Sequence, residues 1–229
     1  MSVYRVQNNT DLSLKGTNTV ANATTLLAES VYYVDAKEGT NYIPTTASGY
    51  MYLPGIAQNR ATTPDAAALD ITGDIDIRVK VAMDKWIPST TMSLVGKWSG
   101  FSNQLSYVFT LRSNGTLGFA WTPTGPYNAN LDRSSTTIVP FSDGSIGWVR
   151  ATLDVNNGSS NYDLKFFTSN DGTTWTQLGD TLNGSATTSI YSSSALLEIG
   201  TNDAGAASPA RGKFYRAQVR NGIDGTVAF

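Results

Sequence analysis

Cysteine and histidine are both absent from this chain of 229 residues. Without cysteine there is no disulfide framework to support the fold, and no redox compartment can be inferred. Without either residue, the nucleophile–base pairs that use a thiolate or an imidazole are excluded. Long hydrophobic runs are lacking too, since no stretch approaches the roughly 18 apolar residues that span a membrane. The composition therefore predicts no membrane partner and excludes catalysis that depends on a cysteine or histidine side chain.

Charge is also scarce, at 15% of residues, with a formal net charge of −2 and no visible basic run. Nucleic-acid binding needs a concentrated cationic face, so we expect no nucleic-acid partner. The first 16 residues lack the basic segment and apolar core of a secretory signal, and no cleaved signal is expected.

Alternation of apolar and polar side chains is what the chain does contain. In residues 74–83, DIDIRVKVAM, every second side chain is apolar. A period of two indicates a strand with one buried and one solvated face, as in antiparallel sheets. On this interpretation Asp74 and Asp76 lie on the solvated face. Further strands are predicted at 105–112, 116–122, 148–155, 162–168 and 213–220.

Turn residues separate these strands. Asn114-Gly115 predicts a tight hairpin in which both residues have positive φ. Asn170-Asp171-Gly172 predicts a second hairpin. Residues 122–145 are polar, punctuated by Pro and Gly, and are interpreted as a long irregular loop of the kind that often carries function. No helical period extends over three turns.

Residues 1–48 differ from the rest, because they are polar, rich in Thr and Asn, and able to bury little apolar surface alone. We expect an extended N-terminal arm that orders against neighbouring subunits, or else a partly ordered tail. Residues 49–229 form the predicted sandwich. The apolar patch expected to make assembly contacts is Val31, Tyr32, Tyr33 and Val34.

Three motifs in order carry a resemblance to the concanavalin A-like, or laminin-G-like, superfamily. They are the Trp-led strand GWVRATLD at 147–154, the hairpin NDGTTW at 170–175, and the closing pair LEIG at 197–200 and GKFYRAQV at 212–219. The resemblance covers about residues 49–229. It implies an all-β fold, an antiparallel two-sheet jelly-roll sandwich.

A second resemblance, based on short stretches of sequence, is to tail or virion proteins from phages of actinobacteria. It is carried by GYMYLPG at 49–55, LDITGDIDI at 69–77 and YRAQVRNGIDGTV at 215–227. It implies a virion structural protein, tail or capsid-decorating, on the exterior of the phage particle. Its partners would be capsid or tail subunits, with a homo-oligomeric state and contact with a host surface glycan. The alternative function is a free, lectin-like carbohydrate-binding module.

Catalysis is not expected. Retaining glycosidases need two carboxylates about 5 Å apart, and the hydrolase branch of the superfamily carries them in a Glu-x-Asp-x-x-Glu strand. The glutamates here, Glu29, Glu38 and Glu198, do not fit that pattern, so a degraded glycosidase is the least favoured hypothesis. Residues 169–175, SNDGTTW, resemble the Asp-box of sialidases but are one residue short. They are interpreted as a turn that places Trp175 on the core side.

Sugar binding needs exposed aromatic rings beside side chains that bond hydroxyls. Residues 121–133 offer both, and Trp98 and Phe101 flank another loop. Core packing is the competing explanation for the aromatics. The candidate ligand-binding residues are Trp121, Tyr127, Asn128, Asn130, Asp132 and Arg133.

Calcium is the one cofactor that the loops suggest, because Asp, Asn and carbonyl oxygens suit a hard cation. The candidate ligands are Asp154 with Asn156 and Asn202 with Asp203. Each pair has too few carboxylates, so turn roles are favoured and no cofactor is predicted.

Overall fold

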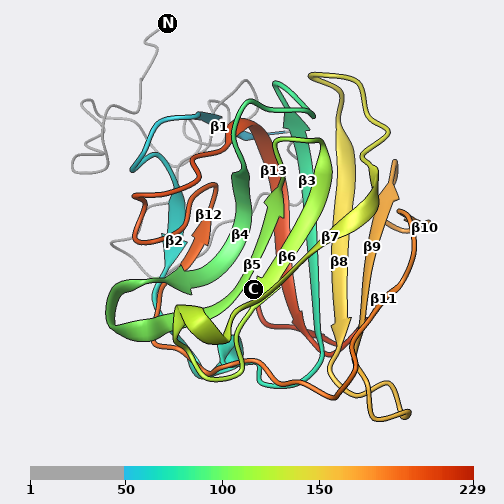
Figure 1. The fold of residues 1–229 in the computed structure, drawn as a ribbon. Coiled ribbons are helices and arrows are strands. Elements are labelled where there is room, and N and C mark those ends of the chain that lie inside the picture. Colours follow the sequence, from blue (N-terminus) through green and yellow to red (C-terminus); the bar gives the residue numbers. More distant parts are fainter. Residues whose placement is uncertain (1–48) are drawn as a thin grey trace, which may run out of the picture.

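Two antiparallel β-sheets pack face to face in residues 49–229, the part of the chain that this computed structural model describes (Figure 1). The predicted all-β, two-sheet sandwich is confirmed. The arm at 1–48 and its contacts at 31–34 lie outside the described residues and stay predictions. The larger sheet has the order β1-β13-β3-β8-β9-β10, with β14 paired to β13 and β11 to β9. Its strands are β1 (Met51–Pro54), β3 (Ile75–Met83), β8 (Gly147–Asp154), β9 (Asp163–Ser169), β10 (Thr176–Gln177), β11 (Leu182–Asn183), β13 (Arg211–Asn221) and β14 (Thr226–Val227).

The smaller sheet has six strands in the order β2-β12-β4-β5-β6-β7. Between residues 49 and 229 the helices are three short 3-10 turns, and none is long or apolar enough to cross a membrane. The strands are β2 (Ala61–Thr63), β4 (Met92–Ser99), β5 (Gln104–Leu111), β6 (Thr116–Trp121), β7 (Leu131–Ile138) and β12 (Leu197–Ile199), and the turns are η1 (Ala67–Leu69), η2 (Phe101–Asn103) and η3 (Tyr127–Ala129).

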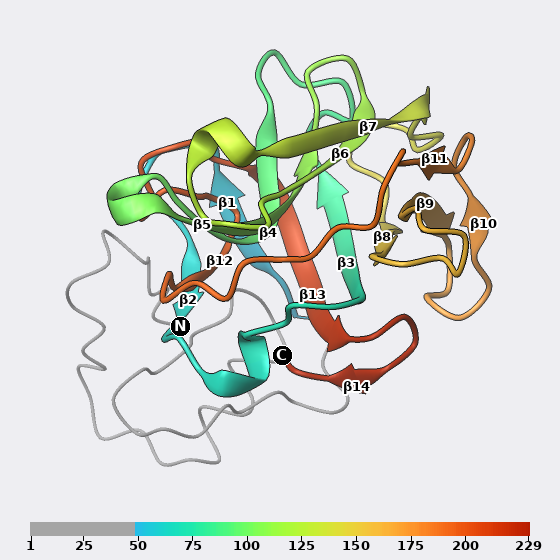
Figure 2. The ribbon, with the colours of Figure 1, turned by 60° about the horizontal axis from the view of Figure 1, so that its bottom comes forward.

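The core lies between the inner faces of the two sheets. The apolar set of β3 that includes Ile77 and Val79 points into it, as the alternation predicted, and meets Phe109 and Phe119 from the smaller sheet. At one end the segment between β11 and β12 runs from sheet to sheet and closes the core (Figure 2). Along it, the amide of Ile190 donates to Thr72 O, and that of Tyr191 donates to Thr122 O.

The outer face of β3, turned away from the core, is not solvated where the alternation predicted it to be. Asp76 is 0% exposed and accepts paired hydrogen bonds from Arg78, at 2.6 and 3.1 Å, and from Arg150, at 2.8 and 2.9 Å. Asp224 also pairs with both guanidinium groups. The ring of Trp175 packs over both guanidinium groups, with its centroid 5.6 Å from the guanidinium carbon of Arg78 and 5.5 Å from that of Arg150. A largely buried ionic cluster at Asp76, Arg78 and Arg150 replaces part of the predicted solvated face.

The Asn114-Gly115 hairpin joins β5 to β6, but by a different turn from the one predicted. Gly115 has a φ of +82°, whereas Asn114 is not among the residues with positive φ. The side-chain oxygen of Asn114 instead accepts from the amide and hydroxyl of Thr116. The amide of Arg112 bonds Thr116 O at 2.8 Å, which encloses a three-residue loop. A left-handed glycine at the third position is common in such loops.

Two further predictions are corrected. Residues 122–145 contain the edge strand β7, whose largely polar and exposed side chains hid it from the alternation test. Polar edge strands are a usual defence against unwanted pairing. Trp175 lies on the outer face of the larger sheet, edge-to-face with Trp148 at 6.3 Å, and not on the core side.

The turn that places Trp175 is held by Asp171. Its Oδ1 accepts from the amides of Thr173 and Thr174, each at 2.7 Å, and from the Ser169 hydroxyl at 2.9 Å. The backbone N–H of Thr174, then that of Thr173 and the Ser169 hydroxyl, lower the pKa of Asp171 below its usual value. Bonds to the charged form favour it.

We therefore expect Asp171→Asn to lower the melting temperature at neutral pH. Because the folded-state pKa is depressed, the stabilisation from the charged form is complete above the unfolded pKa of about 3.9 and is lost as the pH falls below it. In melting curves from pH 7 to pH 3 the difference between the two proteins should be constant down to about pH 5 and should narrow as the pH falls from about 4 to 3, since the loss is complete only below the depressed folded-state pKa. A constant difference across that range would contradict the account.

Candidate ligand-binding site

Trp121 is not the exposed stacking ring that the sequence predicted. Its side chain is 0% exposed, and the ring lies edge-to-face with Tyr162 at 5.1 Å. The indole N–H donates to the hydroxyl of Thr188 at 3.0 Å. Trp121 is thus a core residue, and this part of the predicted site is wrong.

The other residues of the predicted site lie on η3, on β7 or, for Asn130, between the two, and they do not converge on one point. Tyr127 is 73% exposed, while Asn130 has a buried Oδ1 without a partner in the described chain. Asp132 forms an ion pair with Arg112. Arg133 instead lines an open cleft of about 640 Å³ with the segment 183–189. Asn128 is exposed and makes no side-chain hydrogen bond within residues 49–229.

The predicted calcium ligands have turn roles. The side-chain oxygens of Asp154 and Asn156 accept from backbone amides two residues on. Asp203 Oδ1 accepts from the Gly100 amide at 2.9 Å, which ties its loop to the end of β4. Asn202 has a buried Oδ1 without a partner among the described residues. From residue 49 onward, no cluster of three or more acidic side chains is placed to hold a metal ion.

On the outer face of the smaller sheet, a row of small residues lies between two carboxylates. One row crosses five strands, with each residue directly opposite the next. The middle three side chains are small or branched and sheltered from solvent, and the two ends carry acidic groups. The row is Glu198, Gly96, Val108, Ala120 and Asp132.

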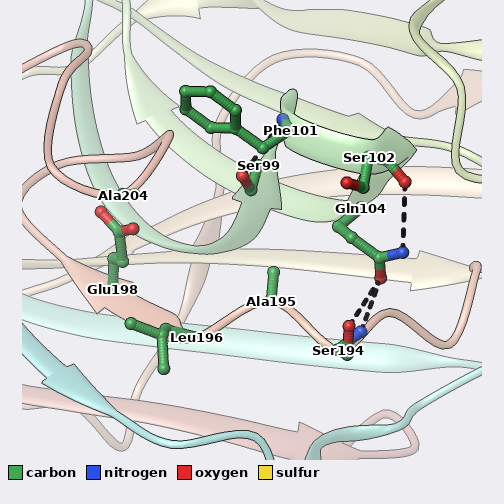
Figure 3. A pocket seen from close by; sticks show the side chains of 9 residues that line it. All are labelled: Ser99, Phe101, Ser102, Gln104, Ser194, Ala195, Leu196, Glu198 and Ala204. Carbon is green, nitrogen blue, oxygen red and sulfur yellow. Dashed lines mark hydrogen bonds between the residues drawn. The ribbon is translucent and has the colours of Figure 1, made fainter.

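A pocket of about 320 Å³ opens at the Glu198 end of this row. Figure 3 shows Phe101 and Ser99 on one side and Glu198 on the other. The lining contains one carboxylate, one amide, three serine hydroxyls and one aromatic ring, and no lysine or arginine. The residues are Ser99, Phe101, Ser102, Gln104, Ser194, Ala195, Leu196, Glu198 and Ala204.

Glu198 is the chemically distinctive group of the pocket. It is 2% exposed, and its Oε2 accepts from the Thr201 hydroxyl at 2.8 Å and the Gly205 amide at 3.0 Å. Arg60 Nε lies 3.7 Å from the same oxygen. In the described part of the chain both hydrogen bonds go to Oε2 and none to Oε1, and the Glu198 side chain lines the pocket (Figure 3). A charged oxygen that accepts no hydrogen bond from the protein is free to accept one from a ligand, and bonds to charged groups are the stronger ones.

The far end of the pocket is fixed by Gln104. Its side-chain oxygen accepts from the amide of Ser194 at 2.7 Å and the hydroxyl of Ser194 at 3.1 Å, and its amide group donates to Ser102 O at 3.3 Å (Figure 3). These bonds join η2 to the segment before β12, about 90 residues away in the chain. The polar groups are therefore held in place before any ligand arrives, which lowers the entropic cost of binding.

Phe101 supplies an apolar surface beside these polar groups. It is 70% exposed because η2 projects from the end of β4, and its amide bonds the Ser99 hydroxyl at 3.3 Å. Single exposed apolar side chains are ordinary, and Phe101 is a candidate contact residue because polar groups converge next to it in a pocket. The sequence showed Phe101 beside a loop, but nothing in it linked that loop to Glu198 or Ser194.

Comparison by sequence matches the chain to no protein family and to no curated protein. Solved structures do resemble it. The CBM40 of Ruminococcus gnavus IT-sialidase, bound to alpha2,3 sialyllactose, is 17% identical and covers 74% of this chain and 91% of that one, with a TM-score of 0.52. Domains LG4-5 of the mouse laminin alpha1 chain are 14% identical over 82% of this chain and 47% of that one, with a TM-score of 0.48. A heptameric SAP-like pentraxin from Limulus polyphemus is 14% identical over 75% of each chain, also with a TM-score of 0.48. The first of these supports the concanavalin A-like, laminin-G-like fold.

Proposed function

We propose that the sandwich at 49–229 is a non-enzymatic, lectin-like module that binds a glycan in the Glu198 pocket. The observation that carries the proposal is that Glu198, whose Oε1 accepts no hydrogen bond from residues 49–229, lines the same pocket as the exposed ring of Phe101. A sugar has hydroxyl donors on its edges and an apolar face of C–H groups, which suit these two partners. The sandwich relative from Ruminococcus gnavus, which carries bound sialyllactose, supports this choice among functions.

The pocket favours a neutral sugar over an acidic one. Among the described residues its lining carries a carboxylate and no cation, and Arg60, the cation beside Glu198, is already paired with that carboxylate, so a ligand carboxylate would find no free cation there. A single carboxylate also cannot act as the paired acid and nucleophile of a retaining glycosidase. We therefore assign binding, not turnover, to this site.

The test is a glycan array followed by calorimetry on the best neutral ligand. Glu198→Gln keeps an acceptor for Thr201 and Gly205 but turns an N–H₂ group toward the pocket. Hydrogen bonds to charged groups contribute about 1.5–3 kcal/mol, so we expect the Kd to rise about tenfold or more. Phe101→Ala removes the apolar surface, and we expect a similar loss.

Tyr127→Ala is the matched control, because it removes an equally exposed ring from the neighbouring η3 turn. Binding should be unchanged in this variant. Loss of binding in Tyr127→Ala with retention in Phe101→Ala would move the site to the loop predicted from sequence. Absence of any ligand on the array would contradict the proposed function itself.

The virion role stays a prediction. The sequence stretches that support it lie within the sandwich. The segment expected to anchor the chain, residues 31–34, is outside the described residues. A glycan-binding sandwich on the exterior of a phage particle would unite both functions, with capsid or tail subunits as partners. Immunogold labelling of purified particles with an antibody to this chain tests that placement.

A further inference from the structure

The outer face of the larger sheet places two cations directly opposite each other. Lys80 of β3 and Arg216 of β13 are cross-strand partners beside a register shift in β13. Like charges in this position destabilise a sheet. Neither side chain has a carboxylate within 4 Å in the described chain, and Arg216 is exposed. The repulsion is therefore left uncompensated by the residues from 49 onward.

A second like-charge pair on the same face is neutralised by carboxylates of this chain. Arg78 and Arg150 are also directly opposite each other, on β3 and β8, two positions along from Lys80. Asp76 and Asp224 bridge both guanidinium groups. One like-charge pair is thus neutralised from within the chain, while its neighbour remains open to an anion from outside.

Two tyrosine rings extend the open pair into a stripe. Tyr215 lies 5.6 Å from Lys80 Nζ and 5.6 Å from the ring of Tyr50, and Tyr50 lies 4.7 Å from Lys213 Nζ. Lys213 likewise has no carboxylate within 4 Å among residues 49–229. Cations and aromatic rings therefore alternate along the surface, where Arg216 is exposed and the other four side chains are half-buried.

We propose that this stripe, formed by Tyr50, Lys80, Lys213, Tyr215 and Arg216, binds an acidic polysaccharide. Anionic substituents on the sugar chain contact the cations, and sugar rings pack on the tyrosines. The few, spaced cations suit a chain with one charge every sugar or two better than a nucleic acid, whose dense phosphates need a larger basic face. The stripe lies on the opposite sheet from the Glu198 pocket, so the two sites can fail independently.

The experiment measures binding of the full chain to dextran sulfate at 50 and 300 mM NaCl, with uncharged dextran as the neutral probe. We expect binding to dextran sulfate alone, with at least a tenfold loss of affinity at the higher salt. The variant Lys80→Gln/Arg216→Gln should lose at least tenfold at 50 mM. Polygalacturonate then shows whether carboxylates replace sulfates.

The control variant Lys85→Gln/Arg112→Gln removes the same charge from two cations that have acidic partners elsewhere. Its affinity should change less than twofold. Because Lys80→Gln/Arg216→Gln relieves repulsion, its melting temperature should not fall, which separates lost binding from unfolding. Equal losses in both double variants, no binding to dextran sulfate at 50 mM, or equally tight binding to single-stranded DNA would each overturn the proposal.

Discussion

Replacing Asp76 by Ala should lower the free energy of unfolding by about 3–5 kcal/mol. The reason is the burial of its partners. Arg78 and Arg150 are both nearly inaccessible and directly opposite each other, and Asp76 neutralises them through four short hydrogen bonds. Without that carboxylate, two buried guanidinium groups keep only the exposed Asp224 as a counter-charge. Equilibrium denaturation in urea measures the change.

Lys85→Ala is the control for Asp76→Ala. It also breaks an ion pair, with Asp143, but both partners are exposed, and exposed pairs contribute about 0–1 kcal/mol. Adding Arg78→Met to Asp76→Ala should recover part of the loss, because one unpaired buried charge is removed. A loss below about 1 kcal/mol in Asp76→Ala would mean that water reaches the cluster.

Trp121→Ala should cost about 3–5 kcal/mol, the range for deleting a large aromatic side chain from a core. The indole is fully buried against Tyr162 and Phe119, and its N–H holds Thr188 in the segment that closes the sandwich. Truncation would leave a cavity in the core and remove the hydrogen bond to Thr188. Denaturation curves measure the loss directly.

Trp121→Phe separates packing from ligand contact. It retains most of the buried ring, so it should remain folded and bind the glycan ligand with unchanged affinity. Tyr127→Ala, an exposed ring in the same predicted site, should be neutral for stability within about 0.5 kcal/mol. Selective loss of glycan binding in a stable Trp121→Phe protein would instead restore Trp121 to the site.

The fold could be predicted from sequence because its strands follow simple periodicity. The apolar set of β3 and the hairpin turns at Gly115 and Gly172 are local signals, and local signals survive in the structure. The edge strand β7 was missed because an edge needs no apolar face in every position, and its residues are largely polar.

The outer faces of the sheets could not be predicted in this way. The alternation of apolar and polar residues distinguishes the two faces of a strand, but it does not show whether the polar face is exposed to solvent. Asp76 is covered only because Arg78, Arg150 and Trp175, up to about 100 residues away in the chain, meet above it. The Glu198 pocket has the same origin, since it joins η2 to residues near 200. Such convergence depends on the tertiary fold.

The most direct test of the account is an NMR titration of the ¹⁵N-labelled chain with the best neutral glycan from the array. We predict that the shifted amide signals cluster at 99–104 and 194–205, on both sides of the Glu198 pocket, and that in Glu198→Gln the same shifts need about tenfold more glycan or are lost. Shifts confined to the cleft between Arg133 and residues 183–189, or no shifts at all, would contradict the assignment of the glycan site.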